Sequence, residues 1–77
     1  MAIPLTDMAP GQGGVVVQLQ GGIGMTSRLD AMGIYPGVYV IKRSAQPLRG
    51  PVEIQVGATT LAIGFGMARR ILVEVAP

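Results

Sequence analysis

Glycine and proline interrupt this chain so often that it can form only short regular elements. Twelve glycines and six prolines are distributed over its 77 residues, and both residue types tend to end helices and strands. Between them lie short runs rich in valine, isoleucine and leucine, several of which alternate with polar residues. This pattern is typical of a small domain built from short strands and tight turns.

The size and composition of the chain require efficient packing. A domain of 77 residues has to bury a large share of its apolar groups in one core, so we expect a single domain over residues 1–77. Hydrophobic residues make up 49% of the chain and charged residues only 13%, a composition that excludes a disordered chain. Cysteine is absent, which excludes disulfides and thiolate metal sites.

Five short runs are predicted to be strands. The first is "VVVQLQ" at residues 15–20, where we expect Val15, Val17 and Leu19 to share one face. The remaining runs lie at residues 38–45, 52–56, 61–65 and 71–75. The runs at 52–56 and 61–65 read as a hairpin joined by a short turn, while the proline-containing residues 1–12 read as an extended lead-in. The sequence thus predicts a mainly β, antiparallel barrel of about five strands.

One short helix is predicted after the first strand, in "MTSRLDAM" at residues 25–32. Thr26 or Ser27 can cap its first turn. Gly33 is expected to end the helix with a positive φ, and Ile34 to fold back onto it in a Schellman-type ending.

A tight turn is predicted directly after this helix stop. Proline fixes the φ required at the second position of such a turn, and glycine accepts the positive φ required at the third. Pro36 and Gly37 supply these two residues in this order. The chain is therefore expected to leave the corner as the strand at residues 38–45.

The segment "GGIGMTS" at residues 21–27 has glycines between a strand and a helix, as phosphate-binding loops do. The dinucleotide fingerprint needs a third glycine, where this chain has Ser27. A P-loop needs a lysine followed by serine or threonine, and the chain contains no such pair. The segment is therefore interpreted as a strand-to-helix connection.

The residue types needed for metal binding and catalysis are scarce. The chain has no histidine and no cysteine, and its carboxylates, Asp7, Asp30, Glu53 and Glu74, are far apart in the sequence. Five methionines are more typical of core packing than of a metal site. We therefore expect no catalytic residue, no metal ligand and no cofactor, and a protein that is not an enzyme.

The charge is mildly basic, with a formal value of +2 and a pI near 9.7. A nucleic-acid-binding face is one interpretation of the six basic residues, which are Arg28, Lys42, Arg43, Arg49, Arg69 and Arg70. Only three aromatic residues are available for stacking on bases, so an ordinary solvated surface is favoured. No apolar run approaches the roughly 20 residues that span a bilayer, and the expected location is the cytoplasm.

Three longer stretches together resemble one known family. They are "GGIGMTSRLDAMGIYPG", "KRSAQPLRGPVEIQV" and "TTLAIGFGMARRILVEV", which together extend the resemblance over about residues 3–76. The chain resembles the FeoA family, ferrous iron transport protein A, whose domain also occurs at the C-terminus of iron-dependent repressors. The resemblance rests on the order and spacing of Leu29, Met32, Gly33, Pro36, Gly37, Pro47, Gly50, Pro51, Ala62, Ala68 and Ile71.

The resemblance implies an SH3-like barrel and a small cytoplasmic accessory protein of ferrous iron uptake. Its implied partner is FeoB, a membrane ferrous transporter with a GTP-binding domain, and the membrane would be reached only through that partner. Catalysis is not implied. The chain departs from the family at residues 64–67, "GFGM", where many members carry charged residues. The alternative is a regulatory or RNA-binding barrel related to the repressor domain.

The helix and the corner after it are the predicted docking region. The expected partner-binding residues are Met25, Arg28, Ile34, Tyr35, Phe65 and Met67. For Ile34 the alternative is that it plugs one end of the barrel, and for Phe65 and Met67 that they belong to the core. The expected structural residues are Gly33, Pro36, Gly37, Gly50 and Pro51. The sequence leaves open the oligomeric state and whether transport is activated or restrained.

Overall fold

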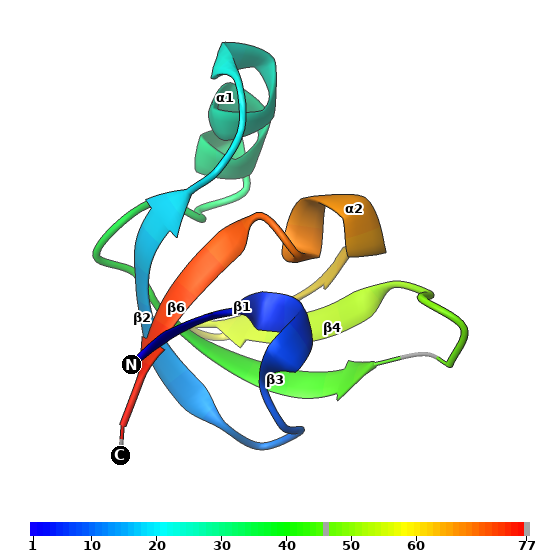
Figure 1. The fold of residues 1–77 in the computed structure, drawn as a ribbon. Coiled ribbons are helices and arrows are strands. Elements are labelled where there is room, and N and C mark those ends of the chain that lie inside the picture. Colours follow the sequence, from blue (N-terminus) through cyan, green and yellow to red (C-terminus); the bar gives the residue numbers. More distant parts are fainter. Residues whose placement is uncertain (46, 77) are drawn as a thin grey trace.

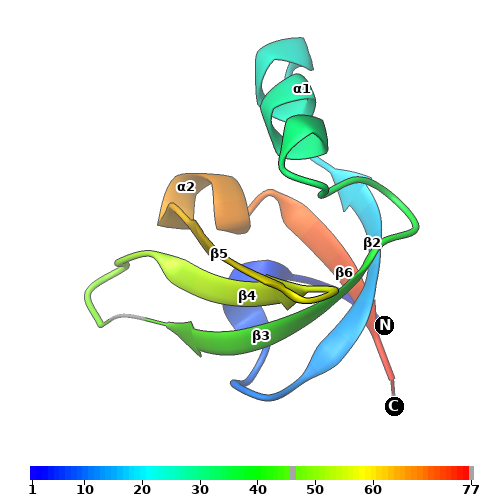
Figure 2. The same ribbon diagram turned by 180° about the vertical axis from the view of Figure 1, so that it is seen from behind.

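Six short antiparallel strands form one strongly curved sheet (Figures 1 and 2). The computed structural model describes residues 1–45 and 47–76. The strands are β1 (Ala2–Pro4), β2 (Gly13–Leu19), β3 (Tyr39–Ala45), β4 (Val52–Val56), β5 (Thr59–Ile63) and β6 (Ile71–Val75), arranged in the order β1-β6-β2-β3-β4-β5. Three helical segments join them: the 3-10 turn η1 (Leu5–Asp7) and the helices α1 (Ile23–Ala31) and α2 (Phe65–Ala68). The predicted mainly β, SH3-like antiparallel fold is confirmed.

The N-terminal segment contributes more structure than its sequence predicted. β1 pairs with β6, with Ile3 opposite Val73, and it adds a strand to the five that were expected. The segment then forms η1, in which Leu5 is completely buried. A three-residue strand carries too little alternation to be recognised locally, because its pairing partner lies at the other end of the chain.

The prediction that Val15, Val17 and Leu19 share one face of β2 is wrong. Val15 and Val17 are exposed, whereas Val16 between them is buried in the core. Leu19, which was expected to share a face with Val15 and Val17, packs against the core instead.

A β-bulge explains this change of face along β2. Val16 lies opposite Val73 of β6, but Gln18 lies opposite Leu72, so Val17 is one extra residue on β2. An inserted residue shifts the alternation of the side chains by one position. Val16 before the bulge and Leu19 after it can therefore both face the core.

The hairpin of β4 and β5 is confirmed, with a shifted second strand. Val56 pairs with Thr59, and Gly57 has a φ of 59° in the two-residue turn between them. A positive φ at this position is typical of hairpin turns that match the twist of the strands. β5 thus begins at Thr59, before the predicted start at Leu61, and Gly64 leads into α2.

The start of α1 also lies earlier than predicted. The helix begins at Ile23 and its N-cap is Gly22, which makes no side-chain cap. The hydroxyl of Thr26 donates to the backbone carbonyl of Ile23 at 3.2 Å, inside the helix. The prediction that Thr26 or Ser27 caps the helix is therefore wrong, because both residues lie beyond its first turn.

The end of α1 forms the predicted Schellman motif. Gly33 has a φ of 86°. Its N–H donates to the carbonyl of Asp30 at 2.9 Å, and the N–H of Ile34 donates to the carbonyl of Leu29 at 2.8 Å. Leu29 and Ile34 are both completely buried in the same core cluster, as is typical of the apolar contact in this motif.

The predicted turn after the helix is also confirmed. The N–H of Val38 donates to the carbonyl of Tyr35 at 3.1 Å, and Gly37, at the third position, has a φ of 101°. This geometry fits a type II turn with Pro36 at its second position. Hydrogen bonds from Gly37 to Val16, at 2.7 Å, and from Val16 to Val38, at 2.8 Å, tie the turn to β2.

Lys42 is the one charged residue that the described part of the chain buries. Its side chain on β3 is 3% exposed, and its Nζ donates to the carbonyl of Thr6 in η1 at 3.0 Å. Burial lowers the pKa of Lys42 below its ordinary value of 10.5, and the nearby Asp7 carboxylate opposes this change. The lysine thus links η1 to the sheet at an electrostatic cost.

We predict that Gly33→Val destabilises the fold by about 1–3 kcal/mol, because a β-branched residue adopts a positive φ only with strain. Apart from Gly33 itself and its two neighbours in the chain, no residue has an atom within 4 Å of the position that a Cβ would occupy at Gly33. Gly33→Asn should consequently keep much of the stability, since asparagine tolerates this conformation. Ala31→Val is the matched control on the exposed last residue of α1. Urea unfolding should show the largest loss of stability for Gly33→Val and smaller losses for Gly33→Asn and Ala31→Val. Equal losses for Gly33→Val and Gly33→Asn would contradict the backbone explanation.

We predict that Lys42 makes stability rise with pH in the alkaline range. Between the lowered pKa of Lys42 in the folded protein and its ordinary value near 10.5, the unfolded chain holds the proton that the folded protein has lost. The free energy of unfolding therefore increases with pH across this window. Lys42→Met should lack the increase, which urea unfolding at a series of pH values measures as a difference between the two proteins. Parallel curves for both proteins would contradict the prediction.

Candidate functional site

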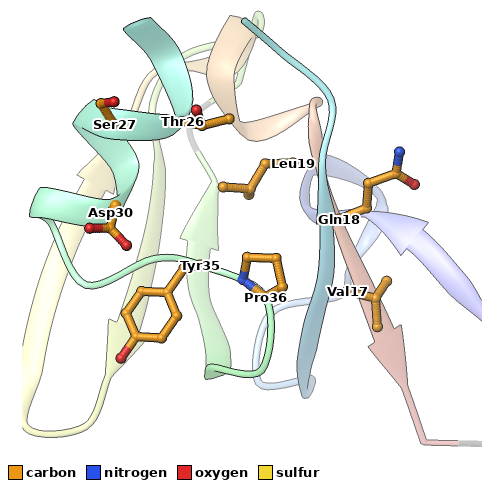
Figure 3. A pocket seen from close by; sticks show the side chains of 8 residues that line it. All are labelled: Val17, Gln18, Leu19, Thr26, Ser27, Asp30, Tyr35 and Pro36. Carbon is orange, nitrogen blue, oxygen red and sulfur yellow. The ribbon is translucent and has the colours of Figure 1, made fainter. Parts of the chain in front are cut away.

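A cleft opens where α1 leaves the barrel (Figure 3). Its volume is about 590 Å³. The end of β2, one side of α1 and the corner after the helix contribute the lining residues, which are Val17, Gln18, Leu19, Thr26, Ser27, Asp30, Tyr35 and Pro36. Figure 1 shows α1 projecting from the sheet. The lining residues place the cleft between this helix and β2, the strand that precedes it.

The cleft owes its shape to backbone features at its two ends. The bulge at Val17 alters the direction of side chains at the end of β2. The Schellman motif at Gly33 ends α1, and the turn at Gly37 returns the chain to β2. The lining is thus held by hydrogen-bonded structure on both sides.

The apolar part of the lining is accessible. Tyr35 is 47% exposed and Val17 is 44% exposed, and Pro36 between them in Figure 3 is exposed as well. These side chains offer a ring and two small apolar surfaces to a ligand. Aromatic residues of this kind are enriched at the centre of protein interfaces.

The polar part of the lining comes mainly from one side of α1. Thr26 and Ser27 contribute hydroxyl groups, and Asp30 contributes the one charged side chain among the lining residues. Asp30 comes from the last turn of α1, and it lines the same cleft as Tyr35 (Figure 3). A cleft lined by a carboxylate and an aromatic ring favours a cationic group on the ligand.

The chemistry of this lining suits binding. No histidine, cysteine or lysine lies among the lining residues to activate the hydroxyl of Ser27.

Across residues 1–45 and 47–76, histidine, cysteine and carboxylate side chains form no group of three or more that could hold a metal ion. Neither helix in the described part of the chain has the length and apolar character needed to span a bilayer.

The structure places the predicted docking residues in three different environments. Tyr35 lines the cleft, Met25 packs against the core from α1, and Arg28 is exposed on the same helix. Ile34 is completely buried, so its side chain is not available to a partner. Ile34 is the apolar residue that folds back onto the helix in the Schellman motif, which explains its burial in the core cluster.

Phe65 and Met67 lie on α2, away from the cleft lining. Both are half-buried, and Met67 packs against the core cluster. The guanidinium of Arg49 lies over the Phe65 ring, 5.8 Å from its centroid, and covers part of it. These two residues are therefore not brought together with Tyr35.

The predicted structural residues Gly50 and Pro51 follow the turn between β3 and β4. The N–H of Gly50 donates to the carbonyl of Pro47 at 3.3 Å. Leu48 and Arg49, at the centre of this turn, have φ values of 59° and 60°, which is the pattern of a type I′ turn. The positive φ values thus fall on the two residues before Gly50.

Sequence reasoning missed most of the cleft. Val17 was expected only to share a face with Val15 and Leu19, Thr26 and Ser27 were considered only as helix caps, and no binding role was given to Gln18 or Asp30. Tyr39 lies outside the cleft, and it was not among the expected partner-binding residues either. Its side chain is 55% exposed, and it lies opposite Val15 in the β2–β3 pair. The available signal was the run of three valines in β2, because a run of this kind also fits a strand in which an outward-facing residue has been inserted.

Comparison with known proteins gives the family. The model of the FeoA domain matches residues 3–75. A crystal structure of an iron uptake regulatory protein, FeoA, is 37% identical, with a TM-score of 0.89 and coverage of 99% of both chains. No curated protein matches the chain.

Two further solved structures have lower sequence identity and show the fold alone. The NMR structure of a FeoA-like protein from Clostridium acetobutylicum is 21% identical, with a TM-score of 0.85 and coverage of 99% of this chain and 88% of the other. A manganese-dependent transcriptional repressor is 18% identical, with a TM-score of 0.89 and coverage of 97% of this chain and 42% of the repressor. Because the family model matches nearly the whole chain, the protein belongs to the FeoA domain family.

Proposed function

We propose that the protein is a non-catalytic accessory module of ferrous iron uptake, which binds a FeoB-type transporter and modulates it in the cytoplasm. Membership of the FeoA family and 37% identity to an iron uptake regulatory protein support the link to iron uptake. The observation that carries the proposed binding role is the cleft between β2 and α1, with Tyr35 exposed on a fixed corner.

The corner is suited to docking because its backbone is already ordered. The hydrogen bonds of the Schellman motif and of the turn at Gly37 hold both sides of Tyr35. A partner that contacts this ring does not have to order the corner first, and this lowers the entropic cost of binding. The buried contact between Leu29 and Ile34 supports the same segment from inside.

The composition of the cleft indicates which kind of segment it accepts. Val17, Tyr35 and Pro36 offer apolar surface, and Asp30 adds a negative charge to the same cleft. A segment of the transporter with an apolar residue next to a lysine or arginine matches both properties. The hydroxyl groups of Thr26 and Ser27 can supply hydrogen bonds at the edge of that contact.

The alternative of a regulatory or RNA-binding barrel rests on the fold shared with the transcriptional repressor, which is 18% identical. The negative charge of Asp30 in the cleft disfavours a nucleic-acid backbone there. Retention of the transporter on the immobilised protein supports the first proposal. Salt-sensitive retention of RNA without the transporter supports the alternative.

We predict that Tyr35→Ala weakens binding to the full-length transporter by about 1–2 kcal/mol, roughly 5- to 30-fold in Kd. Tyr39→Ala is the matched control, since it removes another exposed tyrosine that lies outside the cleft. Asp30→Asn should weaken binding less and should reduce its dependence on salt. Surface plasmon resonance measures all three. Similar losses for Tyr35→Ala and Tyr39→Ala, or no loss for either, place the docking surface elsewhere.

We predict that the protein alone binds ferrous iron only weakly, because the chain has neither imidazole nor thiolate ligands. Anaerobic calorimetry with Fe²⁺, and with Zn²⁺ as a second probe, measures this. A stoichiometric site of submicromolar affinity in the monomer would falsify the assignment of a purely protein-binding role.

A further inference from the structure

Three exposed arginines gather around the short helix α2. Arg69 and Arg70 follow the helix directly. Arg49 comes from the turn between β3 and β4, and its guanidinium lies 5.8 Å from the centroid of the Phe65 ring at the start of α2. This cation–π contact holds the third arginine beside the helix, although it lies far away in the sequence.

The arginines form a row that begins with Arg49 at the start of α2 and ends with Arg69 and Arg70 directly after the helix. Phe65 and Arg69 are four residues apart, so their side chains lie on the same side of the helix, and the N–H of Arg69 donates to the carbonyl of Phe65 at 3.0 Å. At the end of the row, Arg69 and Arg70 line a hollow together with Gln20. The row thus extends from the β3–β4 turn to the end of β2.

No carboxylate neutralises this row in the part of the chain that the structure describes. The one ion pair found there joins the N-terminus to Glu74. The remaining carboxylates lie elsewhere: Asp7 near Lys42, Asp30 in the cleft and Glu53 beside Ser44. The positive charge at α2 is therefore available to an anionic ligand.

An aliphatic side chain projects next to these charges. Leu48 is 98% exposed at the centre of the β3–β4 turn, directly before Arg49. Both residues have positive φ values, which cost conformational energy in residues other than glycine. The turn thus holds a fully exposed leucine and a positioned arginine at its tip.

We propose that this surface, the α2 face of Leu48, Arg49, Arg69 and Arg70, binds the surface of a membrane that contains anionic lipids. Guanidinium groups form paired hydrogen bonds with phosphate oxygens, which lipid headgroups present at high density. An exposed leucine next to arginines can enter the boundary between headgroups and acyl chains. This contact differs from the expectation that the membrane is reached only through the partner.

The exposed leucine favours lipid over nucleic acid as the ligand. Single-stranded RNA is bound chiefly through aromatic side chains on which its bases stack. Phe65 is the one aromatic residue in this row, and it is half-buried beneath Arg49. The α2 face shares no residue with the cleft, so binding to lipid does not depend on the proposed binding of the transporter.

The test is sedimentation of the complete chain with vesicles, in the absence of the transporter. Vesicles of phosphatidylcholine mixed with phosphatidylglycerol should carry the protein into the pellet at low salt, and vesicles of phosphatidylcholine alone should not. High salt should release most of the protein, because screening weakens the contact with the headgroups. Equal sedimentation with both kinds of vesicle, or with neither, overturns the proposal.

Variants locate the surface that is responsible. Arg69→Gln and Arg70→Gln should each weaken partitioning about five-fold, and the double variant more than about ten-fold. Arg43→Gln removes the same charge from an exposed position on β3 and serves as the matched control. Equal losses for Arg43→Gln and Arg69→Gln would mean that binding follows net charge, which overturns the assignment to the α2 face.

Two further measurements separate the parts of the proposal. Leu48→Ser changes a side chain that contacts almost nothing in the folded protein, and it should lower partitioning at high salt more than at low salt. An unchanged profile would overturn the role of Leu48 in the contact. Finally, a single-stranded RNA oligonucleotide should compete poorly with the vesicles. If it binds more tightly than the vesicles at the same salt, the surface binds nucleic acid and the lipid proposal is wrong.

Discussion

The buried contact between Leu29 and Ile34 is the interaction on which the position of α1 and of the corner after it depends. α1 has nine residues, a length at which an isolated helix is marginal in water. Its position is fixed because the Schellman motif at Gly33 brings Leu29 and Ile34 into the barrel core together. The same motif directs the chain into the turn that carries Tyr35. Helix, corner and cleft are therefore consequences of one backbone reversal.

The sequence predicted this reversal because its signals are local. A glycine after a helical segment, followed by an apolar residue and then by proline and glycine, specifies the conformation of each position by its own steric properties. The β4–β5 hairpin was predictable for a similar reason. By contrast, β1 was missed because its pairing with β6 joins opposite ends of the chain, and the early start of α1 was missed because Gly22 makes no side-chain cap.

The candidate site was harder to predict than the fold, because it is formed by the divergence of two elements. Once a bulge is present, the sequence of β2 does not distinguish an inward-facing valine from an outward-facing one. The register with β6 decides that Val16 is buried while Val17 is exposed. Asp30 acquires its significance only because it lines the same cleft as Tyr35. For Ile34 the error was the opposite one. As an apolar residue in a corner it was expected to contact a partner, although the Schellman motif requires its side chain to be inside the protein.

Negative and positive charges lie on different surfaces of this small domain, and each surface carries one of the two proposed contacts. The cleft carries a carboxylate, whereas the α2 face carries arginines without an acidic neighbour in the described residues. The molecule measures only 28 × 27 × 24 Å, so both surfaces lie within a short distance of any membrane that it touches. A weak lipid contact at the α2 face would hold the cleft near a membrane transporter and raise its effective concentration there. Because the two proposed contacts involve different residues and opposite charges, together they would orient the domain as well as locate it. With both proposed contacts in place, a modest affinity at each surface would be sufficient for selective binding to a transporter in its own membrane.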